Sequence, residues 1–149
     1  MFNLTALLGL AAMAAVLAWP GAGLAQSVPE ATSTEASSED SQFLKVYFET
    51  GSARIGEDQS ATLDRAARTF REGDPFVMIV AGGADTVGQA AANLELSLRR
   101  ANAVAAALIA RGIPAERLQV LGRGLSELEV STAPGVAEAR NRVVEISWR

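Results

Sequence analysis

Two side chains of opposite charge form a possible binding pair. Asp85 lies in the glycine-containing segment 82–88, directly after an apolar run, and Arg100 follows fifteen residues later in a segment with helical spacing. A loop at the carboxyl end of a buried strand is a common ligand position in α/β sheets. A carboxylate accepts hydrogen bonds from an ammonium, and a guanidinium holds a carboxylate through two parallel bonds. If the two side chains meet at one rim, they suit a zwitterion such as an amino acid with free amino and carboxylate groups.

Each member of this pair also has a structural interpretation. Asp85 is placed to cap the helix that follows it, and Arg100 to form a salt bridge with Asp85 itself. Arg100 precedes the apolar residue Ala101, which puts it near the edge of the buried helix face, where its stem packs and its fork stays accessible. Arg99 points about 100° away, toward solvent. For Arg100 the residues alone favour neither the ligand role nor the structural role.

The composition excludes several kinds of chemistry. The sequence contains no cysteine and no histidine, which removes disulfides, thiol nucleophiles, imidazole metal ligands and Ser-His-Asp catalysis. The segment 82–88 lacks the phosphate-binding pattern G-x-x-x-x-G-K-[ST], and its only charge is anionic. A glycosidase needs a second carboxylate, and Glu95 is the only candidate near Asp85 in sequence. We therefore predict a binding protein that is not an enzyme and uses no cofactor or metal.

The charges are distributed unevenly along the chain. The sequence holds 13 basic and 17 acidic residues, a formal net charge of −4. Residues 1–25 carry no charged side chain, and residues 26–42 carry four acidic ones and no basic one. The remaining residues, 43–149, are therefore formally neutral. Because nucleic-acid binding normally shows as a basic excess, we predict no nucleic-acid partner.

The first 42 residues are predicted to lie outside the folded domain. Residues 1–25 are apolar and end in small residues at Gly23 and Ala25, which fit a signal-peptidase site. The alternative is an uncleaved membrane anchor, since the apolar stretch approaches the roughly 20 residues that span a bilayer. Both interpretations imply export, and membrane attachment arises only if the segment is retained. Residues 26–42 lack apolar periodicity and are predicted to be a disordered acidic linker.

Residues 43–149 are predicted to form one α/β (α+β) domain. Alternating or continuous apolar residues predict strands, and apolar residues at 3.6-residue spacing predict helices. The expected strands are 44–48, 76–81, 118–121 and 142–148, and the expected helices are 57–72 and 91–111. The apolar stripe of the second helix is predicted to be Leu94, Leu98, Ala101, Ala105 and Leu108. The order β-α-β-α-β-β predicts a mixed sheet with its helices packed mainly on one face.

An ordered series of motifs over residues 43–148 is similar to a known family. The series runs Gly82-Gly83-Ala84-Asp85-x-x-Gly88, Asn93-x-x-Leu96-Ser97-x-x-Arg100-Ala101, Gly122-x-Gly124 and Asn141-Arg142-x-Val144-Glu145. It resembles the OmpA-like C-terminal domain. The resemblance implies a βαβαββ fold that binds peptidoglycan non-covalently through the diaminopimelate residue of the stem peptide. Asp85 and Arg100 match the residues that hold its amino and carboxylate groups, and the second-tier candidates are Thr86, Asn93, Asn141 and Arg142.

The same resemblance implies a location and a set of partners. A domain of this kind tethers its protein, or an envelope complex, to diaminopimelate-type peptidoglycan in the periplasm or cell envelope of a Gram-negative bacterium. Possible further partners are other envelope proteins. The chain departs from the family pattern at Gly83 and Ala84, where His and Thr are usual, and at Val143, where a second Arg is usual. These departures leave an alternative: a structural or protein-interaction module with weakened peptidoglycan binding.

Overall fold

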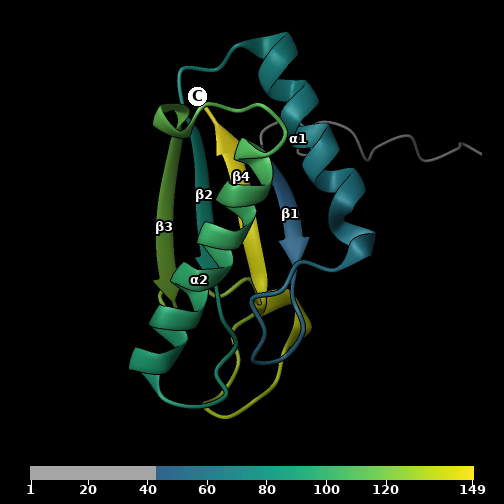
Figure 1. Ribbon diagram of the computed structural model, residues 1–149. Coiled ribbons are helices and arrows are strands. Elements are labelled where there is room, and N and C mark those ends of the chain that lie inside the picture. The colour runs from purple at the N-terminus through teal and green to yellow at the C-terminus, as the bar shows by residue number, and fades with distance from the viewer. Residues whose placement is uncertain (1–42) are drawn as a thin grey trace, which may run out of the picture. The chain divides into compact units, whose positions relative to one another are not determined.

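The structure is a computed structural model in which residues 43–149 are described (Figure 1). Its main elements are β1 (Phe43–Tyr47), α1 (Ser60–Gly73), β2 (Met78–Gly83), α2 (Ala90–Ile109), β3 (Leu118–Gly124) and β4 (Val143–Trp148). Three short 3-10 turns accompany them: η1 (Glu57–Gln59), η2 (Ala115–Arg117) and η3 (Ala139–Asn141). In this part of the chain, neither helix is long and apolar enough to cross a membrane. The predicted segments 1–25 and 26–42 lie outside the described residues.

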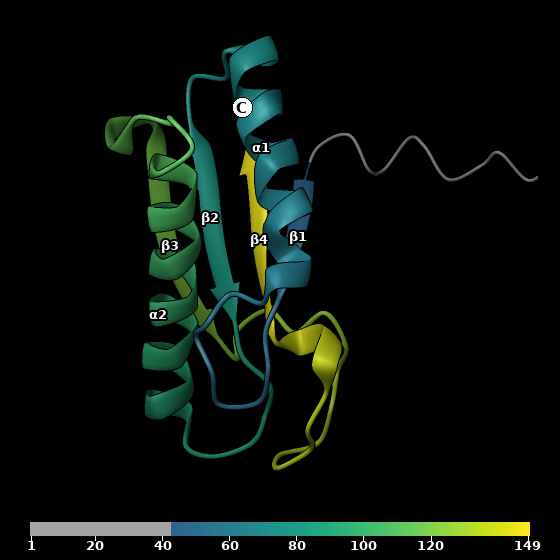
Figure 2. The same cartoon turned by 45° about the vertical axis from the view of Figure 1, so that its right-hand side comes forward.

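The strands form a mixed sheet in the order β1-β4-β2-β3. β4 pairs antiparallel with both β1 and β2, and β2 pairs parallel with β3. Both helices cover the same face of this sheet (Figure 2). The predicted α/β fold, with a mixed sheet and helices on one face, is therefore confirmed. β2 lies between two neighbours and is buried along most of its length, which explains its continuous apolar sequence.

The core lies between the sheet and the two helices. Leu44 and Val46 of β1 point into it, while Lys45 and Tyr47 point to the opposite face, as the alternation in the sequence predicts. Valines and isoleucine of the central strands meet small and aliphatic residues of the helices: Val80, Val144, Ile146, Leu63, Ala66, Val104 and Leu108. This packing fixes the ends of β1, β2 and β4, from which the loops of the candidate site emerge.

The start of β2 lies two residues later than predicted. Phe76 is 84% exposed and lies outside the strand, which runs instead to Gly83. Asp74 adopts a left-handed conformation with φ of 38°, and Pro75 follows it. The chain therefore ends α1 in a sharp bend, after which the side chain of Phe76 is exposed to solvent. The predicted first helix, 57–72, also differs at its start. Residues 57–59 form the 3-10 turn η1, and the α-helix α1 begins at Ser60.

The prediction for the apolar stripe of α2 is partly wrong. Leu94 and Leu98 are 52% and 43% exposed, and the buried stripe is rotated to include Asn93, Ser97 and Arg100. Glycines in the sheet explain this rotation. A Cβ at Gly82 would collide with the backbone carbonyl of Ser97, and one at Gly122 would lie 3.0 Å from the Cβ of Leu98. The helix therefore packs closely on the sheet at this end.

Candidate functional site

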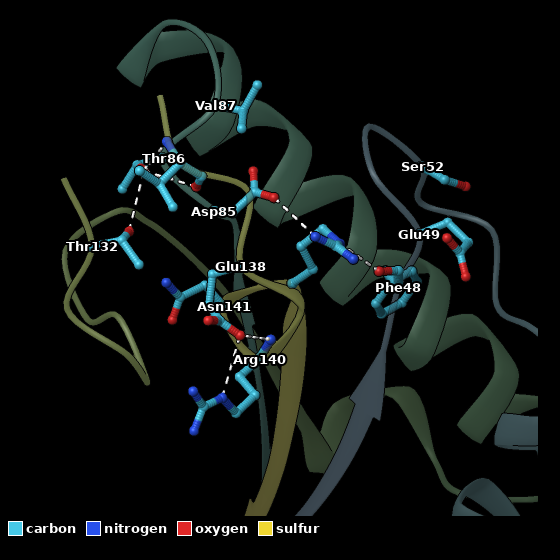
Figure 3. A network of polar contacts seen from close by, with 12 residues as sticks. Phe48, Glu49, Ser52, Asp85, Thr86, Val87, Thr132, Glu138, Arg140 and Asn141 are labelled. Carbon is cyan, nitrogen blue, oxygen red and sulfur yellow. Dashed lines mark hydrogen bonds and ion pairs between the residues drawn. The ribbon is translucent and has the colours of Figure 1, made fainter. Parts of the chain in front are cut away.

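The buried guanidinium of Arg100 lies where three backbone carbonyls converge. Its Nε donates to the carbonyl of Ser52 at 2.7 Å, Nη1 to that of Gly83 at 3.0 Å and Nη2 to that of Glu49 at 3.0 Å. The ring centre of Phe48 lies 5.4 Å from its Cζ. Arg100 is 0% exposed, so the prediction that its fork stays accessible is wrong. The reason is that the segment after β1 and the end of β2 direct their carbonyls toward its donors; Figure 3 shows Phe48, Glu49 and Ser52 on that segment.

The electrostatic state of Arg100 follows from this burial. Burial lowers the pKa of Arg100 to about 10, while the charge of Asp85 opposes this shift and the charges of Arg142 and Arg99 add to it. The side chain therefore remains a cation at neutral pH. A guanidinium has five N–H donors, and the three carbonyls use three of them. Nη1 and Nη2 each keep one N–H for which no described residue supplies an acceptor.

Asp85 forms its ion pair with Arg142 and not with Arg100. Nη1 of Arg142 lies 3.2 Å from Oδ2 of Asp85, and Nε of Arg142 donates to the carbonyl of Phe48 at 2.9 Å. Figure 3 labels the two partners, Asp85 and Phe48. Asp85 is only 5% exposed, and its other oxygen accepts no hydrogen bond from the described residues. The predicted helix cap is wrong, because the N-cap of α2 is Gln89 and no side chain caps it. Arg142 is one of the second-tier candidates, but no pattern in the sequence indicates that it pairs with Asp85.

Thr86 ties the β2–α2 loop to a distant segment. Its hydroxyl donates to the carbonyl of Ala133 at 2.6 Å and accepts from the N–H of Val136 at 3.2 Å. The hydroxyl of Thr132 lies 3.2 Å away (Figure 3). The carbonyl of Thr86 also accepts from the N–H of Gly135 at 2.7 Å. Thr86 is buried and its hydroxyl and carbonyl are both hydrogen-bonded, so these contacts position the loop that carries Asp85.

Asn93 and Asn141 also hold loops through their amides. Asn93 donates to the carbonyl of Val87 at 3.0 Å, next to the start of α2. Asn141 donates to the carbonyl of Val130 at 2.7 Å and accepts from the N–H of the same residue at 2.8 Å. Both amides are buried. Of the four second-tier candidates, only Arg142 contacts Asp85 directly.

Comparison with known proteins assigns this arrangement to a family. A family model described as the OmpA family matches residues 47–142. The chain belongs to the OmpA family. It is 33% identical over 100 residues to outer membrane protein A of Bordetella avium, covering 67% of this chain and 52% of that protein. It is 35% identical over 80 residues to a peptidoglycan-associated lipoprotein of Rhizobium meliloti, covering 54% and 46% respectively. The chain therefore spans about half the length of the curated relatives it matches.

Solved structures agree with the family assignment at the level of the fold. The peptidoglycan-associated lipoprotein of Burkholderia pseudomallei matches with a TM-score of 0.66 and 23% identity, covering 71% of this chain and 90% of that one. The C-terminal domain of Helicobacter pylori MotB matches with a TM-score of 0.61 and 24% identity, covering 70% and 83%. The OmpA-like fold predicted from the ordered motifs is thereby confirmed.

The departures from the OmpA-family pattern are accommodated without loss of loop structure. Ala84 is fully buried, and its N–H donates to the carbonyl of Gly124 at 3.1 Å, so the backbone is held without a hydroxyl at this position. At Gly83 a Cβ would lie 3.1 Å from the carbonyl oxygen of Asn141, which leaves little room for a larger side chain. The carbonyl of Gly83 stays directed to Arg100.

Glu95, the candidate second carboxylate for a glycosidase, has a different partner from Asp85. Glu95 is exposed on α2 and pairs with Arg99, four residues along the same helix. Among the described residues, the ion-pair partner of Asp85 is the guanidinium of Arg142, whereas a glycosidase pairs two carboxylates. Among the described residues, no group of three acidic side chains is arranged to hold a metal ion.

Proposed function

We propose that this OmpA-family domain binds peptidoglycan non-covalently through the diaminopimelate residue of the stem peptide. The observation that carries the proposal is the buried carboxylate of Asp85, which has one oxygen on Arg142 and one without a bond from the described residues. We assign the ligand's ammonium to that second oxygen. A charged hydrogen bond in so enclosed a place is strong, because little water competes with it.

The ligand's carboxylate is assigned to the guanidinium of Arg100, with Arg142 beside it. Arg100 keeps two N–H donors that no described carbonyl takes, and it is a cation at neutral pH. Because its side chain is covered, the segment carrying Glu49 and Ser52 has to yield when the ligand enters. We therefore expect binding to exchange some of these carbonyl contacts for ligand contacts.

The chemistry of diaminopimelate fits this pair of groups. When one end of diaminopimelate is held in the peptide, its other end remains a free amino acid with an ammonium and a carboxylate. Lysine at the same place offers only the ammonium. A site with both an acceptor and a donor therefore favours diaminopimelate over lysine.

The cellular role that we propose is attachment to the wall. Some relatives are named as peptidoglycan-associated lipoproteins and outer membrane proteins. These relatives support the location of this protein in the periplasm or cell envelope of a Gram-negative bacterium. In this scheme residues 1–25 act as a signal peptide or anchor, and residues 26–42 act as a linker. The domain then holds its protein, or an envelope complex, to peptidoglycan.

Sedimentation with purified diaminopimelate-type sacculi tests the proposal. We expect the wild-type protein to co-sediment, and Asp85→Asn to weaken retention by about 2–5 kcal/mol, since it removes one partner of a desolvated charged contact. Arg100→Lys should weaken it too, at a temperature where circular dichroism shows that the variant is folded. The matched control is Asp64→Asn. Asp64 lies on α1, and its exposed carboxylate forms an ion pair with Arg111. Equal retention of wild type and Asp85→Asn would contradict the site assignment.

One observation favours a second candidate function. Arg100 and Asp85 already have partners within the chain, so the site is internally bonded without a ligand. This suits a structural or protein-interaction module of the envelope with weakened peptidoglycan binding. A folded wild-type protein that stays in the supernatant with sacculi would favour this alternative.

A further inference from the structure

A groove of about 690 Å³ opens beside the candidate site, along the loop between β1 and η1 and under η3. Its size falls within the roughly 300–1,000 Å³ of small-molecule sites. We propose that this groove holds a sugar ring of the peptidoglycan glycan, next to a stem peptide bound at Asp85. The inference rests on the proposed function and adds a second class of ligand to it.

The charges that line the groove favour a neutral, hydroxyl-rich ligand. Three arginines and three acidic residues contribute to the lining: Arg54, Arg140, Arg142, Glu49, Glu57 and Asp58. Because the two signs are equal in number, the groove has no net attraction for an anion or a cation. A sugar hydroxyl both donates and accepts, so a pyranose uses guanidinium donors and carboxylate acceptors at once. The planar forks of these side chains offer paired atoms to neighbouring hydroxyls.

Tyr47 gives the groove an aromatic residue with an accessible surface. It lies at the end of β1, lines the groove and is 39% exposed. An aromatic side chain supplies an apolar surface and a polar tip, which suits the mixed polarity of a sugar ring. Phe48 and Ile55 are the other large apolar residues of the lining, and Phe48 is buried. Tyr47 is therefore the lining aromatic that a ligand reaches.

The edge of β1 argues against an extended peptide in the groove. The N–H of Tyr47 points away from β4 and is already bonded to the side-chain oxygen of Gln59 at 3.0 Å. A peptide that joined the sheet as a further strand would need this donor. Gln59 thus blocks strand addition at the place where the groove begins, while its amide adds a planar polar group to the lining.

Arg142 connects the groove to the Asp85 site. It lines the groove and pairs with Asp85 at 3.2 Å, and its Nε is fixed on the carbonyl of Phe48 at 2.9 Å. Ser52, whose carbonyl accepts from Arg100, lines the groove as well. A ligand whose zwitterionic end is at Asp85 therefore continues beside the groove. In peptidoglycan the stem peptide is joined covalently to the glycan, so both parts are available to one domain.

Calorimetric titration with two defined probes tests the inference. The first is the sugar-free stem tripeptide that ends in diaminopimelate, and the second is the same tripeptide on its disaccharide. We expect the wild-type protein to bind the disaccharide-peptide about ten-fold more tightly. Tyr47→Ala and Arg54→Gln should remove this advantage and leave the affinity for the sugar-free peptide unchanged. Arg54 forms no ion pair with the described residues, so its substitution spares the fold. The matched aromatic control, Phe76→Ala, should change neither affinity.

The outcomes separate this inference from the proposed function. Equal wild-type affinity for both probes would overturn the sugar assignment while leaving the Asp85 site in place. Loss of affinity for the sugar-free peptide in Tyr47→Ala or Arg54→Gln would also overturn it, because the groove would then hold the peptide. If the folded wild-type protein binds neither probe, the proposed function fails and the inference fails with it.

Discussion

The guanidinium of Arg142 lies 3.2 Å from the carboxylate of Asp85, although 57 positions separate the two residues in the sequence. The contact joins the loop after β2 to the end of η3. Within residues 43–149 the buried carboxylate has Arg142 as its one charged partner, and its other oxygen accepts no hydrogen bond. Asp85 is therefore held in place before a ligand arrives, so its contribution to the stability of the fold is coupled to its proposed binding role.

Replacing Arg142 tests this coupling. Arg142→Gln should lower the free energy of unfolding by about 1–3 kcal/mol, because it leaves the Asp85 carboxylate buried without its partner. Adding Asp85→Asn to Arg142→Gln should lower the free energy of unfolding little further, because the Asp85–Arg142 ion pair is already lost. Urea denaturation of the two single variants and the double variant measures the coupling. Strictly additive costs would show that the 3.2 Å contact contributes nothing.

Arg100 is expected to stabilise the fold as well as to bind. Arg100→Met keeps most of the stem volume but leaves the carbonyls of Glu49, Ser52 and Gly83 without their donors. We expect a loss of about 3–5 kcal/mol in the free energy of unfolding. Arg99→Met is the control on the same helix, and its cost should stay within about 0.5 kcal/mol because Arg99 is exposed. Similar costs for both variants would contradict the structural role of Arg100.

The lowered pKa of Arg100 predicts where pH matters. Below about pH 10 the side chain is protonated in both the folded and the unfolded chain, so it adds no pH dependence to stability. Above about pH 10 the folded chain begins to bind fewer protons at Arg100 than the unfolded chain, whose guanidinium titrates at a higher pH, so this group alone favours folding as the pH rises. The stability difference between wild type and Arg100→Met should therefore be constant from about pH 6 to about pH 9. A steady drift of this difference across that range, seen by urea titration, would refute the assignment.

The close approach of α2 to the sheet predicts an intolerant glycine. Gly82→Ala would place a methyl group on the carbonyl of Ser97, within the helix that carries Arg100. We expect a loss of more than about 3 kcal/mol in the free energy of unfolding, or failure to fold. The control is Gly73→Ala at the end of α1, where a Cβ meets nothing within 4 Å. A Gly82→Ala protein as stable as Gly73→Ala would show that the helix does not need this contact.

The strands and helices were predictable from the sequence because their apolar patterns are local. β1 alternates and β2 is continuously apolar, and these patterns match their positions at the edge and in the middle of the sheet. The face of α2 was harder to predict, because Leu94 and Leu98 are as apolar as core residues. Their exposure depends on the glycines opposite, which set how closely the helix packs. Gly82 and Gly122 were the signal that could have corrected the rotation.

The site was predictable only in part, for a related reason. Asp85 and Arg100 were identified by type and spacing, but the acceptors of Arg100 are backbone carbonyls, which any residue provides. No sequence pattern marks a loop whose carbonyls converge on a guanidinium. The pairing of Asp85 with Arg142 is equally hidden, because it depends on how two loops fold together. Sequence reasoning therefore found the charged side chains and missed their partners.

Discrimination between two stem peptides tests the binding proposal most directly. The probes are the tripeptide ending in meso-diaminopimelate and the same tripeptide ending in L-lysine, titrated into the wild-type protein and Asp85→Asn. We expect the wild type to bind the diaminopimelate peptide at least about ten-fold more tightly than the lysine peptide, and Asp85→Asn to lose most of its affinity for both. Equal wild-type affinity for the two peptides, or an Asp85→Asn protein that binds as well as wild type, would contradict diaminopimelate recognition at this site.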